Sequence, residues 1–288
     1  MKKNLEAVLR IIARLILKKY KPKIIAITGS VGKTSTKEAI FSAVKNSFVT
    51  RQSQKNYNNE IGVPLTIIGK KSENASIIGW FKVIIFAIGL ILKKDKQYPE
   101  LLVLEIATDQ PGDIAYLRTI ITPDIVVLTS IAGVHLEAFG TVDRIAKEKL
   151  DLVKDLSDTT PIFINIDNEY LAKEYSLNKR LHYIPFGFDD KAVIKATSDR
   201  LLTDKKNRYR VLGIEAKIEV EEEKGVLFLP GVISKAHIYS GLAAIAVSRA
   251  LGKPFVSVLE DLRSYHLPAG RMKLLPGIKQ TLIIDDTY

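Results

Sequence analysis

Residues 28–35 read Thr28-Gly29-Ser30-Val31-Gly32-Lys33-Thr34-Ser35, and they directly follow the apolar run Ile24-Ile25-Ala26-Ile27. A buried strand that turns through glycines into Gly-Lys-Thr is typical of a phosphate-binding loop (P-loop), because glycines let backbone N–H groups close on the phosphates. Lys33 is expected to reach the β- and γ-phosphates, and the Thr34 hydroxyl to hold Mg²⁺. All eight residues are therefore our candidate binding site for ATP or GTP.

This loop is a shorter variant of the common pattern, which has a glycine where this chain has Ile27. The alternative is an ordinary strand-to-helix turn. The apolar strand before the loop and the helical stretch after it favour nucleotide binding over that alternative.

The composition limits the chemistry that the chain performs. Its 288 residues suffice for one large domain or two modest ones, and 47% hydrophobic and 26% charged residues are typical of a globular protein. The chain has no cysteine, which excludes disulfides, zinc–thiolate sites and cysteine nucleophiles. A reducing cytoplasm is compatible with this composition.

The net charge of +11 is concentrated at the N-terminus, where residues 1–22 hold seven Lys or Arg and one acid, Glu6. Such a local excess does not predict a nucleic-acid partner. Within it, residues 4–19 have the pattern of a cationic amphipathic helix. Two interpretations stay open: the helix packs on the protein body or a partner, or it lies on an anionic membrane surface.

A second apolar stretch, residues 77–92, contains sixteen residues and one charge, Lys82. A bilayer-spanning helix needs about 20 apolar residues, so this stretch is predicted to be a buried or interfacial helix. Peripheral membrane contact through 4–19 and 77–92, on the cytoplasmic face, is thus one of our expectations.

The alternation of apolar runs and helical stretches predicts an α/β fold. Near-continuous apolar strands separated by helices indicate a mostly parallel sheet with helices on both faces. Residues 191–230, with short alternating segments, predict a small antiparallel excursion. We expect two parts, the N-terminal helix at 1–22 and an ATP-binding domain at 23–288. The predicted strands are 23–28, 101–107, 124–130, 161–165 and 281–285, and the predicted helices are 34–46, 77–94, 111–121, 141–157, 168–176 and 235–251.

Polar residues follow several of the predicted strands. Glu105, His135 and Asn165 lie at or just after three of them, and acids follow the last one. Each alone is more often a helix cap or a turn former. Because ligand sites in open α/β sheets lie beyond the carboxyl ends of the strands, together they indicate a metal–nucleotide site.

These segments, taken in order, resemble the central domain of the Mur ligases, the ATP-dependent amide-forming enzymes of peptidoglycan synthesis. The resemblance covers about residues 23–288. The segment Asn58-Asn59-Glu60-Ile61-Gly62-Val63-Pro64 is the most specific part and resembles the branch that adds D-alanyl-D-alanine to a UDP-muramyl-tripeptide. The other matching pieces are 27–38, 104–107 with 111–114, 135–140, Ala269-Gly270-Arg271-Met272 and Ile284-Asp285-Asp286-Thr287-Tyr288.

The resemblance implies a reaction through an acyl phosphate, driven by ATP with two Mg²⁺ ions. By residue-by-residue correspondence, Lys33 would stabilise the γ-phosphate, and Thr34 with Glu105 would hold the first Mg²⁺. His135 would help to hold the second. The family also uses a carbamoylated lysine near that ion, and Lys149 stands at the matching position. The alternative for Lys149 is a solvated helix lysine.

The remaining site residues are also implied by the resemblance. Asn165 and Asn168 match the region that holds adenine, and Arg271 and Asp286 match positions near the phosphates and the ribose. Residues 58–60, Asn58, Asn59 and Glu60, fall where the family contacts its nucleotide–sugar peptide. Their alternative is a loop turn and helix cap.

Some departures from the family pattern leave the substrate open. The family's UDP-binding first domain does not precede the loop, and its third domain would begin after residue 288, so we expect a fragment that is inactive alone. Residues 74–98 look like an insertion. The alternatives to the D-alanyl-D-alanine ligase are a relative acting on another carboxylate (a folyl, cyanophycin or lipid-linked cell-wall precursor) and a non-catalytic, membrane-docked nucleotide-binding module.

Overall fold

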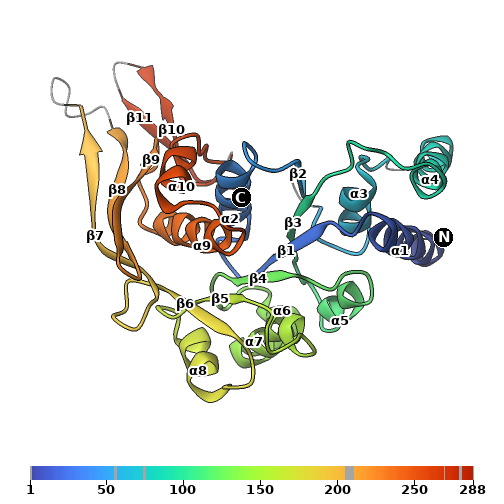
Figure 1. The fold of residues 1–288 in the computed structure, drawn as a ribbon, viewed down its shortest axis with the longest axis horizontal. Helices are drawn as coiled ribbons and strands as arrows, with labels where there is room; N and C mark the ends of the chain where they lie inside the picture. The colour runs from blue at the N-terminus through green and yellow to red at the C-terminus, as the bar shows by residue number, and fades with distance from the viewer. Residues whose placement is uncertain are drawn as a thin grey trace.

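A nine-stranded sheet organises the computed structural model, which describes residues 2–54, 57–73, 76–204, 211–268, 270–278 and 281–287 (Figure 1). Its order is β2-β3-β1-β4-β5-β6-β7-β8-β9. Strands β2 to β7 are parallel, and β7, β8 and β9 are antiparallel. The strands are β1 (Lys23–Thr28), β2 (Thr50–Gln52), β3 (Leu101–Glu105), β4 (Ile125–Leu128), β5 (Ile162–Asn165), β6 (Tyr183–Gly187), β7 (Ile194–Thr203), β8 (Val211–Val220) and β9 (Glu223–Pro230).

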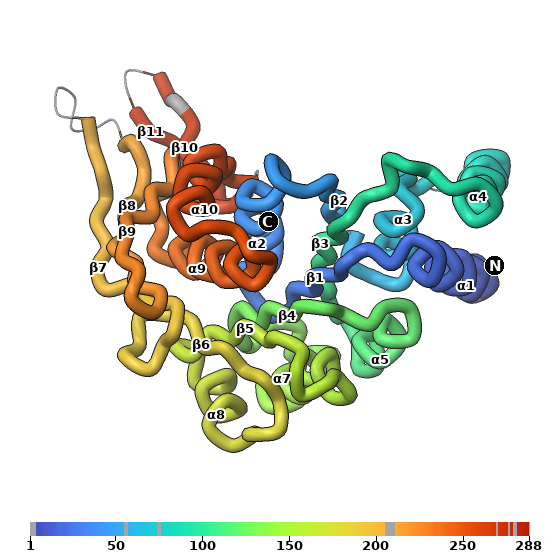
Figure 2. Tube along the Cα trace, viewed as in Figure 1, coloured from blue at the N-terminus to red at the C-terminus, as the bar shows by residue number. Residues whose placement is uncertain are grey.

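Helices cover both faces of this sheet, because successive residues of the buried strands face opposite sides. In β1, Ile25 and Ile27 pack with α2, α9 and α10, whereas Ile24 and Ala26 pack with the other helices. In Figure 2, α2, α9 and α10 lie together on one side of β1, apart from the other helices. The helices are α1 (Lys2–Tyr20), α2 (Lys33–Val44), α3 (Gly62–Ile68), α4 (Ile77–Leu92), α5 (Asp113–Arg118), α6 (Leu136–Phe139), α7 (Val142–Leu150), α8 (Glu169–Leu177), α9 (Ala236–Ala250) and α10 (Phe255–Leu262). The predicted α/β fold class is confirmed.

The N-terminal helix α1 packs on the body of the protein. Leu9, Ala13 and Ile16 on its inner side are fully buried in the core that α1 shares with α3 and α4. Lys19 Nζ donates hydrogen bonds to the last carbonyls of α4, those of Leu90 (2.8 Å) and Ile91 (2.9 Å). Packing on the body, the first of the two interpretations, is therefore what the structure shows. The domain boundary at residue 22 stays a prediction.

The helix α4 has sixteen residues, and its inner side packs on α1. No helix in the described ranges is long and apolar enough to cross a bilayer.

The strand predicted at 281–285 is present, but the prediction that it belongs to the parallel sheet was wrong. These residues form β11 (Leu282–Asp285), which pairs antiparallel with β10 (Lys273–Pro276) in a separate two-stranded sheet. The apolar side chains of β11 are about half exposed, with Ile283 at 52%. An apolar run alone does not distinguish a buried parallel strand from a hairpin strand.

Other elements are shorter than predicted or were not predicted. The expected helix 141–157 ends at Leu150 and continues as a 3₁₀ turn at Asp151–Val153. The expected helix 111–121 begins only at Asp113, because Gly112 takes a φ of +97° before it. The elements that the sequence patterns did not predict are β2, β6, β10, α3, α6 and α10.

The packing of α1 makes a prediction about stability. Ile16→Ala removes a side chain that is fully buried, so it should lower the free energy of unfolding by about 2–5 kcal/mol. Ile11→Ala on the same helix, where the side chain is 56% exposed, should change it by about 0.5 kcal/mol or less. Urea unfolding measures both. Equal, small effects would show that α1 does not pack on the body in solution.

Candidate functional site

The loop between β1 and α2, residues 28–33, is called here the glycine loop. Gly32 takes a φ of +86° at the N-cap position, directly before α2. The Ser30 N–H donates to the Ser130 carbonyl (2.6 Å), and the Thr129 hydroxyl donates to the Val31 carbonyl (2.6 Å). The segment after β4 therefore braces the loop on one side.

The two glycines of this loop are required for different reasons. At Gly29 a Cβ would collide with the Thr129 hydroxyl and would lie 2.9 Å from the Ser130 carbonyl oxygen. At Gly32 the nearest side-chain atom, Thr129 Cβ, would lie 3.7 Å away, so the space is sufficient. Only the left-handed backbone conformation demands a glycine there.

Lys33, the first residue of α2, lies over this loop. Its Nζ donates to the carbonyls of Gly29 (2.8 Å) and Ser30 (3.0 Å). Burial lowers the pKa of the Lys33 amine, the carboxylate of Glu105 raises it, and the positive charge of Arg271 lowers it. The structure thus brings three of the predicted site residues, from three separate parts of the chain, within electrostatic reach of one another.

Thr34 and Glu105 form the centre of the site. The Thr34 hydroxyl donates to Glu105 Oε2 (3.0 Å), and the Asn58 amide donates to Glu105 Oε1 (3.1 Å). Glu105 is 3% exposed at the end of β3, and Lys37 Nζ lies 3.8 Å from its Oε2. Sequence reasoning missed Lys37, although its position one turn after Thr34 on a predicted helix places it on the same face.

The segment 58–60 comes just before α3, contacts the start of that helix, and also borders the site. Asn59 Oδ1 accepts from the Gly62 N–H (3.0 Å), so the capping alternative holds for Asn59. Asn59 and Glu60 also line a hollow of about 200 Å³, together with Asp109 and Asp113 from the loop after β3. The predicted substrate-contact residues therefore lie at the same edge of the sheet as Glu105.

The oxygen atoms of this cluster fit a magnesium ion. Mg²⁺ keeps several waters and is usually bound by one or two protein oxygens plus substrate phosphates. The Thr34 hydroxyl and the Glu105 carboxylate match that pattern. Three or more His, Asp or Glu side chains suited to a metal do not come together in the described part of the chain, so a purely protein-built cage is not present there.

Lys149 lies inside the protein rather than on its surface. It is 2% exposed on α7, whereas Lys147 on the same helix is exposed. Burial lowers the pKa of Lys149 to about 7, and the positive charge of Lys33 contributes to the lowering. The alternative of a solvated helix lysine was wrong, because α7 turns this position toward the glycine loop.

His135 lies after β4, in the part of the molecule that also holds Asp109 and Lys149. Its backbone φ is +57°, and its Nε2 lies 3.9 Å from Asp109 Oδ1. Asp109 also contributes to the electrostatic environment of both Lys33 and Lys149. Residues from the segments after β3 and β4 thus meet near Lys149.

Asn165 and Asn168 hold the segment after β4. The Asn165 amide donates to the Thr129 carbonyl (2.9 Å), and the Asn168 amide donates to the Ile131 carbonyl (2.9 Å). Asn168 Oδ1 also accepts from the Leu171 N–H (3.4 Å) at the start of α8. Their contact with adenine stays a prediction.

Arg271 and Asp286, which flank the hairpin β10–β11, lie near His237 of α9. Asp286 Oδ1 accepts from the Met272 N–H (3.2 Å), and the charge of Arg271 acts on Lys33. Residues Ala269 and Tyr288 of the quoted motifs lie outside the described residues.

A buried polar contact behind α2 was not found by sequence reasoning. His237 Nδ1 lies 3.2 Å from the Tyr265 hydroxyl, and burial lowers the pKa of His237 to about 4, so the ring is neutral at neutral pH. Next to it, the Thr36 hydroxyl donates to Ser240 Oγ (3.2 Å). Thr36 and Ser240 are 204 positions apart in the sequence, and His237 and Tyr265 are 28 apart. No local sequence pattern connects the members of either pair.

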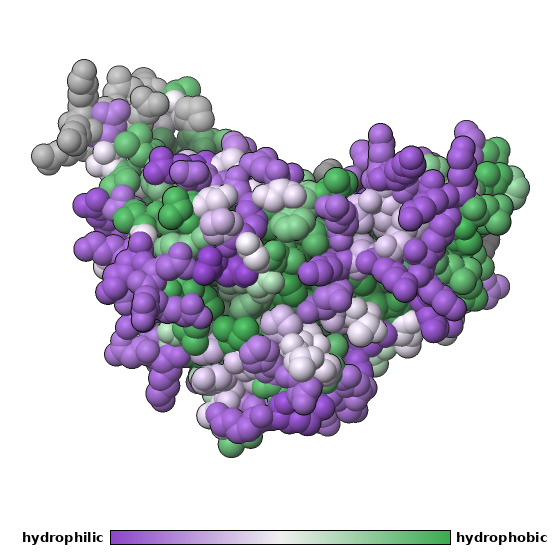
Figure 3. Space-filling view, viewed as in Figure 1, coloured by the Kyte–Doolittle hydropathy of each residue, from purple (hydrophilic) through white to green (hydrophobic). Residues whose placement is uncertain are grey.

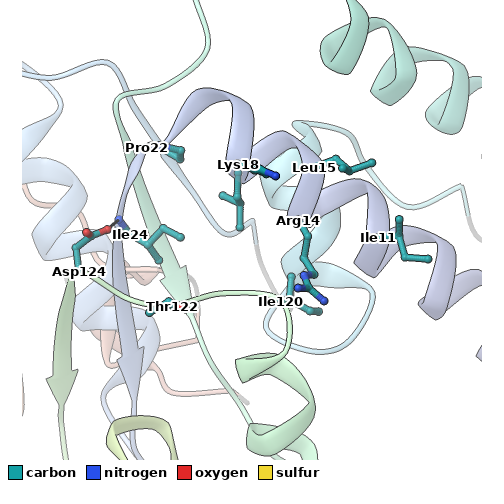
Figure 4. Close-up of a pocket in the computed structure, with 10 residues that line it drawn as sticks. Ile11, Arg14, Leu15, Lys18, Pro22, Ile24, Ile120, Thr122 and Asp124 are labelled. Atoms are coloured by element: carbon teal, nitrogen blue, oxygen red, sulfur yellow. Dashed lines mark hydrogen bonds between the residues drawn. The ribbon is translucent and has the colours of Figure 1, made fainter. Parts of the chain in front are cut away.

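Another hollow, of about 570 Å³, does not belong to this site (Figure 4). It lies between α1 and the start of β1, lined among others by Arg14, Lys18, Pro22 and Asp124. The Ile24 N–H at the amino end of β1 donates to Asp124 Oδ2 (2.8 Å). The glycine loop is at the opposite, carboxyl end of that strand.

Comparisons with known proteins point to one family. The family model of the Mur ligase middle domain matches residues 27–78 and 87–248. The UDP-N-acetylmuramoyl-tripeptide–D-alanyl-D-alanine ligases of Buchnera aphidicola and Escherichia coli are 27% and 26% identical to the chain over 96% and 92% of its length. These matches cover 54% and 52% of the two relatives, so the chain spans about half their length.

Solved structures show the same fold. A MurF structure from Acinetobacter baumannii superposes with a TM-score of 0.78 at 22% identity, covering 98% of this chain and 54% of that one. The MurF ligase from Thermotoga maritima in complex with ADP gives 0.76 at 27% identity, covering 98% and 57%. The family resemblance predicted from the motifs is confirmed.

The two glycines give a prediction that needs no ligand. Gly32→Ala should lower the free energy of unfolding by about 1–2 kcal/mol, the cost of a left-handed residue with a side chain. Gly29→Ala should cost about 1–3 kcal/mol more, because the added Cβ also collides with the segment after β4. Urea unfolding of both variants measures the difference. A Gly29→Ala variant as stable as Gly32→Ala would contradict the close approach.

Proposed function

Because this chain belongs to the Mur ligase family, we propose that it forms the ATP-binding part of an enzyme that joins D-alanyl-D-alanine to a UDP-MurNAc-tripeptide. The observation that carries the proposal is the contact of Thr34 and Asn58 with the buried Glu105 beside the glycine loop. The names of the relatives and the ADP in the Thermotoga structure support it. Such an enzyme of cell-wall synthesis would work in the cytoplasm.

The proposed reaction has two steps. A carboxylate oxygen of the tripeptide bonds to the γ-phosphorus of ATP while the bond to the bridging oxygen breaks, which releases ADP and leaves an acyl phosphate. The amine of D-alanyl-D-alanine then attacks the acyl carbon, phosphate leaves, and the nitrogen loses a proton. Both steps develop negative charge on oxygen, so fixed cations and N–H donors stabilise their transition states.

The first step would use the glycine loop and its neighbours. The backbone N–H groups at the start of α2 and the Lys33 ammonium would hold the β- and γ-phosphates. Thr34 and Glu105 would hold Mg²⁺, which draws charge from the phosphate oxygens. Arg271 would add positive charge at the same place, since it already acts on Lys33. Asn165, Asn168 and Asp286 would border the adenosine.

Lys149 would serve the second ion as a carbamate, with His135 as its neighbour. An uncharged amine reacts with CO₂ to give a carbamate anion and a proton, and burial favours the uncharged form of Lys149. A carbamate is an oxygen ligand, which suits Mg²⁺ as an ammonium does not. Asn58, Asn59 and Glu60 would contact the peptide substrate from the neighbouring hollow.

The function is tested by phosphate release from the protein in its full encoded length. With ATP and Mg²⁺, release should require both UDP-MurNAc-tripeptide and D-alanyl-D-alanine. Release that needs neither, or that needs a lipid-linked or folyl carboxylate instead, would overturn the substrate assignment. Binding of ATP by this chain alone is measured by its thermal stabilisation, which reaches about 2.7 kcal/mol at a ligand concentration 100 times Kd.

Lys33→Ala should lower turnover by about 100-fold or more, because one preorganised donor to a developing charge contributes that much. The matched control is Lys45→Ala, at the exposed far end of α2, which should leave turnover unchanged. Phosphate release measures both. Full activity of Lys33→Ala would remove this lysine from the mechanism.

Lys149→Ala should abolish turnover, and a short carboxylic acid such as formate or acetate should restore part of it by replacing the carbamate oxygens. Lys147→Ala, two residues away on the exposed side of α7, should be active without rescue. The readout is phosphate release over a series of carboxylate concentrations. Lack of rescue in a folded Lys149→Ala variant that still binds ATP would argue against the carbamate.

A further inference from the structure

The outer face of α4 is apolar and exposed to solvent. Its side chains lie at the helical spacing of one continuous stripe, and Lys82 is the single charge within the helix. A contiguous exposed surface of this kind marks an interaction site more often than scattered apolar residues do. The exposed apolar residues are Ile77 (74%), Ile78 (72%), Phe81 (63%), Ile85 (53%), Phe86 (40%), Ile88 (44%) and Leu92 (80%).

The opposite face of α4 fixes the helix in place. Val83, Ala87 and Leu90 are buried against the core that α1 and α3 share. The last carbonyls of α4 accept hydrogen bonds from Lys19 and Tyr20 of α1. The apolar stripe is thus presented outward by a helix whose other side is already packed.

Exposed lysines precede, interrupt and follow this stripe in the sequence, and they are called here the basic rim. Between residues 70 and 96 the chain has six lysines and two acids, Glu73 and Asp95. Lys70 Nζ lies 3.9 Å from the centroid of the exposed Phe86 ring, so a cation directly adjoins the apolar face. Figure 3 shows apolar atoms over α4 at one edge of the molecule, next to strongly hydrophilic atoms. The lysines of the rim are Lys70, Lys71, Lys82, Lys93, Lys94 and Lys96, all exposed.

The family architecture does not account for this face. The match to the Mur ligase middle domain leaves out residues 79–86, which are the middle of α4. None of the residues assigned to the nucleotide or the peptide substrate lies on α4. The face therefore needs an explanation of its own, independent of the proposed ligase function.

We propose that the outer face of α4 docks the protein on an anionic lipid membrane, with the helix lying in the plane of the interface. The aliphatic and phenyl side chains would enter the acyl boundary, and the lysines of the rim would meet anionic headgroups. Sixteen residues are too short for a span, and a strongly apolar face with cationic flanks is typical of an interfacial helix.

Charge complementarity favours the lipid over a second copy of the chain. A symmetric pairing of two α4 faces would bring the lysines of one rim against the same lysines of the other, with only Glu73 and Asp95 to offset them. An anionic membrane surface supplies negative charge to all six lysines at once. Lipid is therefore the occupant that this surface fits.

The test uses vesicles of phosphatidylcholine with and without 30% phosphatidylglycerol, about one lipid in three. The chain should float with the anionic vesicles at least about 10-fold more strongly than with the neutral ones, and the difference should shrink as salt is added. Trp80, the one tryptophan of the chain, lies on α4. Its fluorescence should be quenched by brominated acyl chains in the anionic vesicles.

Two variants separate the apolar and the charged contributions. Ile78→Gln with Phe81→Gln should lower anionic-vesicle binding by about 10-fold or more, and so should Lys93→Glu with Lys94→Glu. The matched control is the double variant Leu177→Gln on α8 with Val256→Gln on α10, which changes exposed apolar positions elsewhere. This variant should bind the vesicles as the parent protein does. Circular dichroism verifies that each variant is folded.

Several outcomes would overturn the proposal. The proposal fails if the protein binds neither kind of vesicle or binds both equally. It also fails if the two α4 variants bind anionic vesicles with the affinity of the parent protein. Sedimentation that shows a dimer which the α4 variants abolish, without vesicle binding, would assign the face to a second copy instead. Because flotation needs no ATP or peptide substrate, failure here leaves the ligase proposal intact, and failure of phosphate release leaves this one intact.

Discussion

The position of β1 between β3 and β4 is the constraint on which the site depends. Because all three strands are parallel, the chain leaves each of them at the same edge of the sheet. The glycine loop therefore emerges with Glu105 on one side and Thr129 on the other. The hydrogen bond between the Ser30 N–H and the Ser130 carbonyl (2.6 Å) and the one between Thr34 and Glu105 (3.0 Å) fix the loop from both sides.

Much of this arrangement was predictable from the sequence, because the strands that form the edge are buried on both faces. Such strands read as short apolar runs, and the polar residues that end them stand out, as Glu105 and Asn165 do. The parallel order then requires those residues to meet. The glycine pattern located the loop, since Gly29 and Gly32 serve needs that no other residue meets.

The parts that were not predicted depend on contacts between distant segments. The hairpin β10–β11 is apolar enough to pass for a buried strand, and only its pairing partner decides its place. Likewise, nothing near His237 in the sequence indicates that Tyr265 will lie against it. Propensity and periodicity describe a segment and its exposed face, but not which segment packs on it.

Three buried lysines show why burial alone does not define a site residue. Lys37 lies 3.5 Å from Glu38 and 3.8 Å from Glu105, and Lys253 donates to Asp261 and to the Ala43 carbonyl, both at 2.5 Å. Both amines thus have carboxylate or carbonyl partners within the fold, which is the usual structural role of a buried lysine. Lys149 differs, because burial, together with the nearby charge of Lys33, lowers its pKa to about 7. A lysine placed where a positive charge is disfavoured is suited to chemistry as a neutral amine.

The helix α1 connects the two regions of the molecule that carry proposals. It packs on α3, whose start is capped by Asn59 at the edge of the site, and on α4, whose outer face is the proposed membrane surface. The site opens at the carboxyl ends of the strands, whereas α4 lies on the outer side of the helices that cover one face of the sheet. Docking through α4 would thus orient the protein on a membrane while leaving the glycine loop, at the carboxyl end of β1, on the aqueous side.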